Sequence, residues 1–222
     1  MFARISRALA RRRLKDPAYG FLFEPGPPDE AISLDCETTG LDRRKDEIVS
    51  VAAVKIRGRQ VVTSEAFTAT VRCQAAINPT AIKVHGLRES DVAMGKAMAQ
   101  VLPELIRFIG GRPLVGYYID FDVAMINRYL RAWLGVGLPN PQWEVSGLYY
   151  DRKYGNAPPG THVDLSFASI ARDFGIELID QHDALADATT AALMHVMLKD
   201  MQTRRVRIPR APYAPTDGFS AG

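Results

Sequence analysis

Residues 31–40 are Ala-Ile-Ser-Leu-Asp-Cys-Glu-Thr-Thr-Gly, and they carry the most informative pattern in the sequence. It predicts a short apolar strand that runs into two acids, Asp35 and Glu37. Because side chains on a strand alternate between its faces, both acids project to one side, and Leu34 and Cys36 project to the other. Two carboxylates on one face repel unless a cation lies between them, and oxygen-only ligands suit Mg²⁺ or Mn²⁺. Taken alone, the pattern also fits a solvated strand end with two surface acids.

Two more strands are expected after this one, with short turns between them. Residues 48–56 are rich in β-branched side chains and predict a central strand, and residues 60–71 alternate as a third strand. Three consecutive strands of this kind indicate an antiparallel meander. The rest of the chain indicates an α/β layout, with a buried strand at 113–117, a helix opening at Asn78-Pro79, and helices at about 96–109, 122–134, 165–174 and 184–201.

Further acids stand near two of the expected helix starts. Asp122 follows Phe121 at the start of one helix, where an aspartate is most often only an N-cap. Asp183 is a good N-cap for the last helix, and Asp187 lies one turn inside it among alanines. An aspartate on such a small, apolar face must be paired or bound to a cation. His182 comes just before this helix, where a lone histidine is usually a surface or capping residue.

Taken together, these acids follow an order that resembles the DEDDh 3′→5′ exonucleases, the DnaQ-like family. Asp35 and Glu37 match its first motif, Asp-x-Glu-Thr-Thr-Gly, and Asp122 matches the second, Gly-x₄-Phe-Asp. His182 and Asp187 match the third, His-x-Ala-x-x-Asp-Ala. The resemblance spans about residues 31–198. It implies a ribonuclease-H-like exonuclease fold of the α/β class, with a central mixed five-stranded sheet flanked by helices.

The resemblance also implies the roles of individual residues. Four carboxylates would hold two Mg²⁺ or Mn²⁺ ions, and His182 would act as the general base on the attacking water. The ion ligands would be Asp35, Glu37, Asp122 and Asp187. Five residues are expected to contact the 3′-terminal nucleotide. For two of them, Leu41 and Phe121, ordinary packing in the core is the alternative. The full set of expected substrate contacts is Thr38, Gly40, Leu41, His85 and Phe121.

One departure from the family stands beside the second motif. Where the family often has His-Asn, this chain has Tyr117-Tyr118. The two aromatic side chains remove no metal ligand, but they could alter how a 3′ end is held or change the substrate preference. Asp120 is a rival to Asp122 because it lies only two residues away, and the Phe-Asp context favours Asp122.

The charge is distributed unevenly along the 222 residues, whose net charge is +3. Basic ends flank an acidic middle. We therefore divide the chain into a basic, Pro/Gly-rich N-terminal arm (1–28), an exonuclease domain (29–202) and a disordered basic C-terminal tail (203–222). The arm is expected to be solvated and to touch a polyanion or a partner. The ends could grip nucleic acid in a salt-sensitive way or dock a DNA polymerase subunit.

Composition narrows the classes further. The chain has two cysteines without CxxC spacing and no run of 18 apolar residues, so neither a disulfide scaffold, a cysteine zinc site nor a membrane span is expected. A cytoplasmic location fits, and a mitochondrial presequence at the Arg-rich start is the alternative.

The sequence thus predicts a metal-dependent enzyme that releases nucleoside monophosphates from the single-stranded or frayed 3′ end of DNA, in proofreading or repair. An RNA-trimming exonuclease is the first alternative, because no residue decides between deoxyribose and ribose. A nucleic-acid-binding scaffold of the same fold without activity is the second. Four clustered acids argue against it, since a binding module has no use for them.

Overall fold

The computed structural model describes residues 2–179 and 182–210, apart from the side chains of 2–6, 84, 85 and 89. The elements of the described chain, in order, are α1 (Phe2–Arg12), the 3₁₀ helix η1 (Pro17–Phe23), β1 (Glu30–Thr38), β2 (Ile48–Arg57), β3 (Gln60–Thr70), α2 (Pro79–His85), α3 (Glu89–Ala93), α4 (Met98–Ile109), β4 (Leu114–Gly116), α5 (Ile119–Leu134), β5 (Gln142–Glu144), α6 (Val145–Lys153), α7 (Phe167–Asp173) and α8 (Ala184–Thr203).

One mixed sheet of five strands forms the centre of the molecule, in the order β3-β2-β1-β4-β5. The first three strands are antiparallel neighbours, which confirms the expected meander, and β4 and β5 run parallel to β1. The predicted α/β class with a five-stranded mixed sheet is therefore confirmed. No helix in the described part of the chain is both long and apolar enough to cross a membrane.

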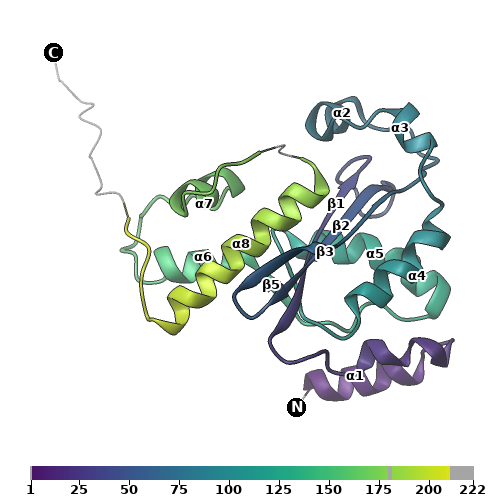
Figure 1. The fold of residues 1–222 in the computed structure, drawn as a ribbon, viewed down its shortest axis with the longest axis horizontal. Helices are drawn as coiled ribbons and strands as arrows, with labels where there is room; N and C mark the ends of the chain where they lie inside the picture. The colour runs from purple at the N-terminus through teal and green to yellow at the C-terminus, as the bar shows by residue number, and fades with distance from the viewer. Residues whose placement is uncertain (1, 180–181, 211–222) are drawn as a thin grey trace.

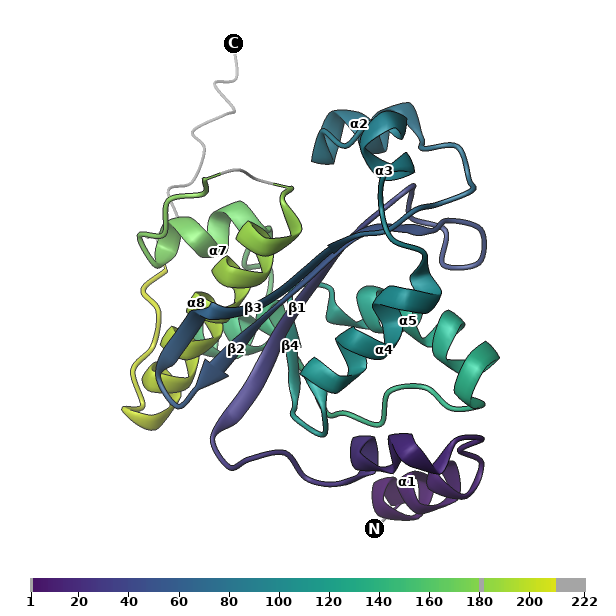
Figure 2. The ribbon, with the colours of Figure 1, turned by 45° about the vertical axis from the view of Figure 1, so that its right-hand side comes forward.

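Helices cover both faces of the sheet, α4 and α5 on one side and α6, α7 and α8 on the other (Figures 1 and 2). Successive side chains of β1 point to opposite faces of the sheet, so they pack against different helix layers. Ile32, Leu34 and Cys36 are buried in the core that α4 and α5 complete. Ala31 belongs to the core beneath α8. The side chains of Asp35 and Glu37 share the alternate face with Ala31, so they project toward α8.

The basic N-terminal segment differs from the solvated arm that the sequence suggested. Tyr19, Leu22 and Phe23 of η1 are buried in the same core as α4 and α5. The backbone N–H of Lys15 donates to the carbonyl of Leu134 at the end of α5 (3.0 Å). The segment is held by apolar burial, which its six early cations and later prolines conceal in the sequence.

The start of the C-terminal tail also differs from the expectation of disorder. Within residues 203–210, Ile208 is buried in the core beneath α8, and its N–H donates to the carbonyl of Arg152 (3.3 Å). One apolar side chain is enough to fix this short stretch against α6. Residues 211–222, the rest of that predicted tail, lie outside the described residues.

Candidate active site

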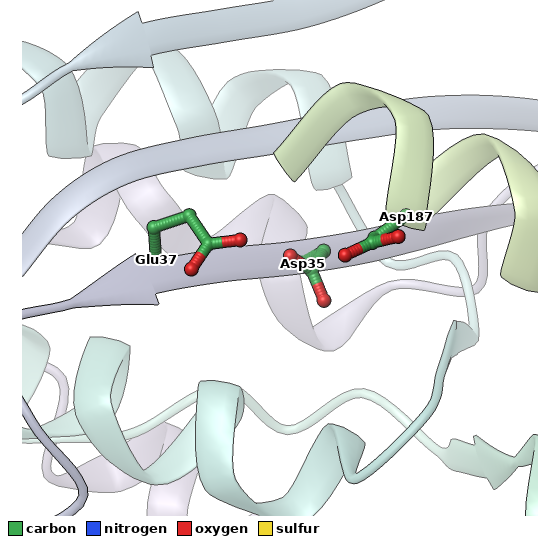
Figure 3. A group of neighbouring side chains, drawn as sticks. All are labelled: Asp35, Glu37 and Asp187. Atoms are coloured by element: carbon green, nitrogen blue, oxygen red, sulfur yellow. The ribbon is translucent and has the colours of Figure 1, made fainter. Parts of the chain in front are cut away.

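Asp35, Glu37 and Asp187 come together beside the central strand (Figure 3). One carboxylate oxygen from each of the three lies within 4.8 Å of the other two. Asp35 and Glu37 lie two residues apart on β1, opposite the small residues Ala52 and Ser50 of β2. Small residues across the ladder leave space above β1 for the acids and for the first turn of α8.

Capping by Asp183 fixes where α8 begins. Its carboxylate accepts from the backbone N–H groups of Leu185 (3.0 Å) and Ala186 (2.9 Å), as its predicted N-cap role requires. Asp187 therefore lies in the first turn of α8. Its Oδ2 accepts from the backbone N–H of His182 (3.1 Å). The hydrogen bond between His182 and Asp187 holds the residues before α8 close to the acid cluster.

Asp122 is 4% exposed and lies close enough to Asp35 and Glu37 for their charges to act on it. The helix α5 begins at Ile119, three residues earlier than the sequence indicated, so Asp122 is in its first turn and is not its N-cap. Its side chain accepts a hydrogen bond from the backbone of Cys36, the residue between Asp35 and Glu37 on β1. The rival Asp120 is exposed and pairs with Arg43 (2.9 Å). Asp122 is not one of the three acids whose oxygens lie within 4.8 Å of one another, and its role as a metal ligand stays a prediction.

Burial and mutual repulsion disfavour the ionised forms of these acids. Burial, and then the charges of Glu37 and Asp187, raise the pKa of Asp35 well above its usual value. Burial and the neighbouring acids raise the pKa of Glu37 to about 7. Burial and the charges of Asp35 and Glu37 also raise the pKa of Asp122. The pKa of Asp187 is raised by burial, although its hydrogen bond from His182 acts in the opposite direction.

This donor set fits divalent cations. Carboxylate oxygens are hard ligands, and like charges held this close in a partly dry site are stabilised by a cation between them. Among the ion pairs of the described residues, none joins Asp35, Glu37 or Asp187 to a lysine or arginine. A metal ion is the species that the arrangement suits.

His182 lies at the rim of this site. Its backbone has a φ of +68°, and its side chain is exposed. With Glu37, Asp183 and Leu185 it lines a cavity of about 610 Å³. The imidazole is therefore close to the acids, in an open position from which it can reach a water molecule or a phosphate.

The expected substrate contacts lie in different environments. Thr38 is buried, and its hydroxyl donates to the carbonyl of Gly40 (2.7 Å). Leu41 is 85% exposed. Phe121 packs partly against the core, with the Arg43 guanidinium 5.6 Å from its ring centre. The side chain of His85, the last residue of α2, lies outside the described residues.

Two acids that support the site were not singled out from the sequence. Asp46 accepts from the hydroxyl of Thr39 (3.0 Å) and from the N–H of Asp42 (2.7 Å), so it shapes the loop after Thr38. Glu144 accepts from the N–H groups just before and at the start of α5. The bonds of Glu144 reach residues that are 25 and 26 positions away in the sequence. Thr39 is seven residues from Asp46. Local sequence patterns therefore reveal neither role.

Comparisons with known proteins identify the family and the fold. Residues 32–194 match the family model described as Exonuclease. The chain belongs to this exonuclease family. It is 30% identical over 167 residues to DNA polymerase III subunit epsilon of Aquifex aeolicus, an alignment that covers 75% of this chain and 79% of that protein. It is also 30% identical to the DNA polymerase III PolC-type protein of Caldanaerobacter subterraneus, over 78% of this chain and only 12% of the relative.

Solved structures show the same fold. E. coli exonuclease I in complex with a dT13 oligonucleotide superposes with a TM-score of 0.65 at 18% identity, over 80% of this exonuclease and 42% of that chain. Exonuclease I from Methylocaldum szegediense gives a TM-score of 0.62 at 19% identity, covering 79% and 41%. The predicted DnaQ-like family and its class, a 3′→5′ exonuclease that hydrolyses phosphodiesters, are confirmed. The assigned roles of single residues stay predictions.

Proposed function

We propose that this exonuclease removes nucleoside monophosphates from the 3′ end of single-stranded or frayed DNA with two Mg²⁺ or Mn²⁺ ions. The observation that carries the proposal is the convergence of Asp35, Glu37 and Asp187 from β1 and α8. Asp122, which is buried, would complete the ligand set. When bound, the two ions would stabilise charge on the attacking and leaving oxygens of the phosphodiester.

The residues of the chain divide the remaining work. His182 would accept the proton of the attacking water, whose oxygen bonds to phosphorus while the bond to the 3′ oxygen of the preceding nucleotide breaks. Its exposed position next to Glu37 allows this, and the link from its backbone to Asp187 keeps it near the acids. Leu41 and Phe121 would pack against the terminal base, and Thr38, Gly40 and His85 would contact the terminal nucleotide.

DNA is favoured over RNA by the relatives. The subunit epsilon and PolC-type relatives are named as parts of DNA polymerase III, and the exonuclease I complex contains a DNA oligonucleotide. The similarity to a subunit of DNA polymerase III also supports another subunit of a DNA polymerase as a binding partner. We place the enzyme in proofreading or repair on this basis.

Degradation of labelled oligonucleotides tests the proposal. Single-stranded DNA and RNA of one sequence, labelled at the 5′ end, are incubated with the protein and Mg²⁺, Mn²⁺ or EDTA. We expect a ladder of shortened, still labelled DNA with either metal, and none with EDTA. A ladder from RNA alone would overturn the choice of substrate. Metal binding without a ladder from either polymer would favour the inactive scaffold.

Two aspartates on α5 provide a matched pair for the same assay. Asp122→Asn should abolish cleavage because it removes a ligand. Asp120→Asn, only two residues away and exposed, should leave cleavage within about twofold. Equal activity of the two variants would contradict the assignment of the ligands.

A further inference from the structure

Tyr118 has a backbone conformation that a tyrosine rarely adopts. Its φ and ψ are 60° and 30°, in the left-handed region, at the N-cap of α5. Asp29, His182 and Arg205 are the other described residues besides glycine with a positive φ, so Tyr118 is the one large aromatic among them. Left-handed geometry costs an L-residue free energy, and asparagine or glycine is the usual occupant. Such strain persists only where the surroundings enforce it.

Glu144 is the group that enforces it. One carboxylate oxygen accepts from the N–H of Tyr118 (3.2 Å) and the other from the N–H of Ile119 (3.1 Å). The first oxygen also accepts from the hydroxyl of Ser146 (2.9 Å), so the carboxylate is itself held in place at the start of α6. The turn before α5 is therefore clamped by a side chain from β5.

The turn lies directly beside the catalytic acids. β4 runs parallel to β1, with Val115 opposite Ser33, and a Cβ at Gly116 would lie 2.9 Å from the carbonyl oxygen of Leu34. The chain therefore leaves β4 next to Asp35, about one strand spacing, roughly 4.8 Å, from β1. Asp122, one turn into α5, is close enough to Glu144 for the two charges to interact.

The ring of Tyr118 is presented to solvent, although it is large and apolar. Tyr118 is 68% exposed, and among the described residues its ring stacks edge-on against one other ring, that of Tyr117, at 5.2 Å between ring centres and 76° between planes. Tyr117 is firmly placed. Its hydroxyl donates to the carbonyl of Leu165 (3.0 Å), and its ring packs on Phe167 at 5.1 Å.

We propose that Tyr118 is a substrate-binding residue whose ring stacks on a nucleobase of the bound single strand next to the scissile end. A strained, clamped and exposed aromatic beside an acid cluster gives such a platform, because stacking on an aromatic ring is favourable for every base. The inference rests on the proposed function. It adds a base contact that holds the single strand without reading its sequence.

Substitutions at Tyr118 separate stacking from stability. Tyr118→Asn removes the ring and relieves the backbone, so we expect the melting temperature to rise by about 2–4 °C. KM for single-stranded DNA should rise about 5- to 100-fold, as for one lost base stack, with kcat within about threefold. Tyr118→Phe should keep the wild-type KM. Tyr150→Asn is the control, since Tyr150 is also an exposed tyrosine, 41%, but lies within α6.

A fluorescent base distinguishes stacking by Tyr118 from a purely structural role, because a change in protein stability alone would not alter the fluorescence of the base. Oligonucleotides with 2-aminopurine at the 3′-terminal position or at one of the next three positions are mixed with the protein in EDTA. Stacking on a tyrosine quenches this base, so the wild type and Tyr118→Phe should quench it at one position and Tyr118→Asn should not. An unchanged KM in Tyr118→Asn, or no Tyr118-dependent quenching at any position, would overturn the inference. If the wild type instead neither cleaves DNA nor binds it, the proposed function itself fails.

Discussion

The residue Asp35 shows how an acidic site lowers the free energy of unfolding of the metal-free protein. Its carboxylate is surrounded by other acids, and burial and their charges raise its pKa. Ionisation of this group therefore costs the metal-free fold free energy. We expect Asp35→Asn to abolish cleavage and yet raise the melting temperature in EDTA at pH 8, because the variant has no charge to bury there. Glu177→Gln, at an exposed acid, should change neither property, and a destabilised Asp35→Asn would contradict the account.

Glu37 makes metal binding depend on pH. Its pKa is raised from 4.5 to about 7, so the folded state holds a proton that the unfolded chain has lost between these values. The stability of the metal-free protein therefore falls as pH rises through this window. Because ligands bind metals in the deprotonated form, Mn²⁺ affinity should fall by up to about tenfold per pH unit below 7. Titration of Mn²⁺ by electron paramagnetic resonance at pH 6, 7 and 8 measures this, and equal affinities would refute it.

His182 should affect turnover and leave the acids intact. His182→Ala removes the proposed base but keeps the backbone N–H that donates to Asp187. We expect kcat to fall by ~10²-fold or more, the usual loss for a general base, with Mn²⁺ affinity within about twofold. Cleavage at the native rate would remove His182 from the mechanism. His162→Ala, at an exposed histidine, should leave both quantities unchanged.

Among the elements, α8 links the site to a buried histidine, His195. His195 is 4% exposed, stacks on Trp143 with 6° between the ring planes, and has no partner for its Nδ1 within the described chain. Burial, and then the charge of Lys199, lower its pKa to about 4. Since the unfolded value is about 6.5, neutral His195 favours the fold above that pH. This contribution is lost as pH falls toward 4.

The burial of His195 predicts how steeply the unfolding free energy changes with pH. Between pH 7 and 5 the wild type should lose up to about 2 kcal/mol of unfolding free energy more than His195→Gln does. His195→Gln itself should be less stable at pH 7, because it loses the stacking on Trp143. Urea unfolding at the two pH values measures the difference. Parallel slopes for the two proteins would show that His195 does not titrate in this way.

Elements also show how far the sequence could lead. The capped helix after Asp183 and the strand that carries Asp35 were predicted well, because periodicity and capping are local properties. The start of α5 was placed three residues late, since Tyr118 replaces the usual cap with a left-handed turn that Glu144 holds from another strand. Glu144 itself could not be identified, because its role depends on the pairing of β5 with β4.

The whole molecule is where the sequence was least informative. The order of acids predicted the family and its sheet, but the first 28 residues were read as a solvated arm. Their charge pattern is that of an arm, whereas η1 contributes three buried side chains to the core shared with α4 and α5. Burial of this kind depends on a surface that distant elements create, so no window of the sequence contains it.

Leu22 tests whether the N-terminal segment is part of the folded body. It is 0% exposed among the side chains of that core, so Leu22→Ala leaves a cavity as well as losing apolar burial. We expect a loss of about 2–4 kcal/mol in unfolding free energy, or roughly 4–16 °C in melting temperature. Leu9→Ala, at a leucine of α1 that is 51% exposed, should cost no more than about 0.5 kcal/mol. Equal stability of the two variants would mean that the segment behaves as a solvated arm after all.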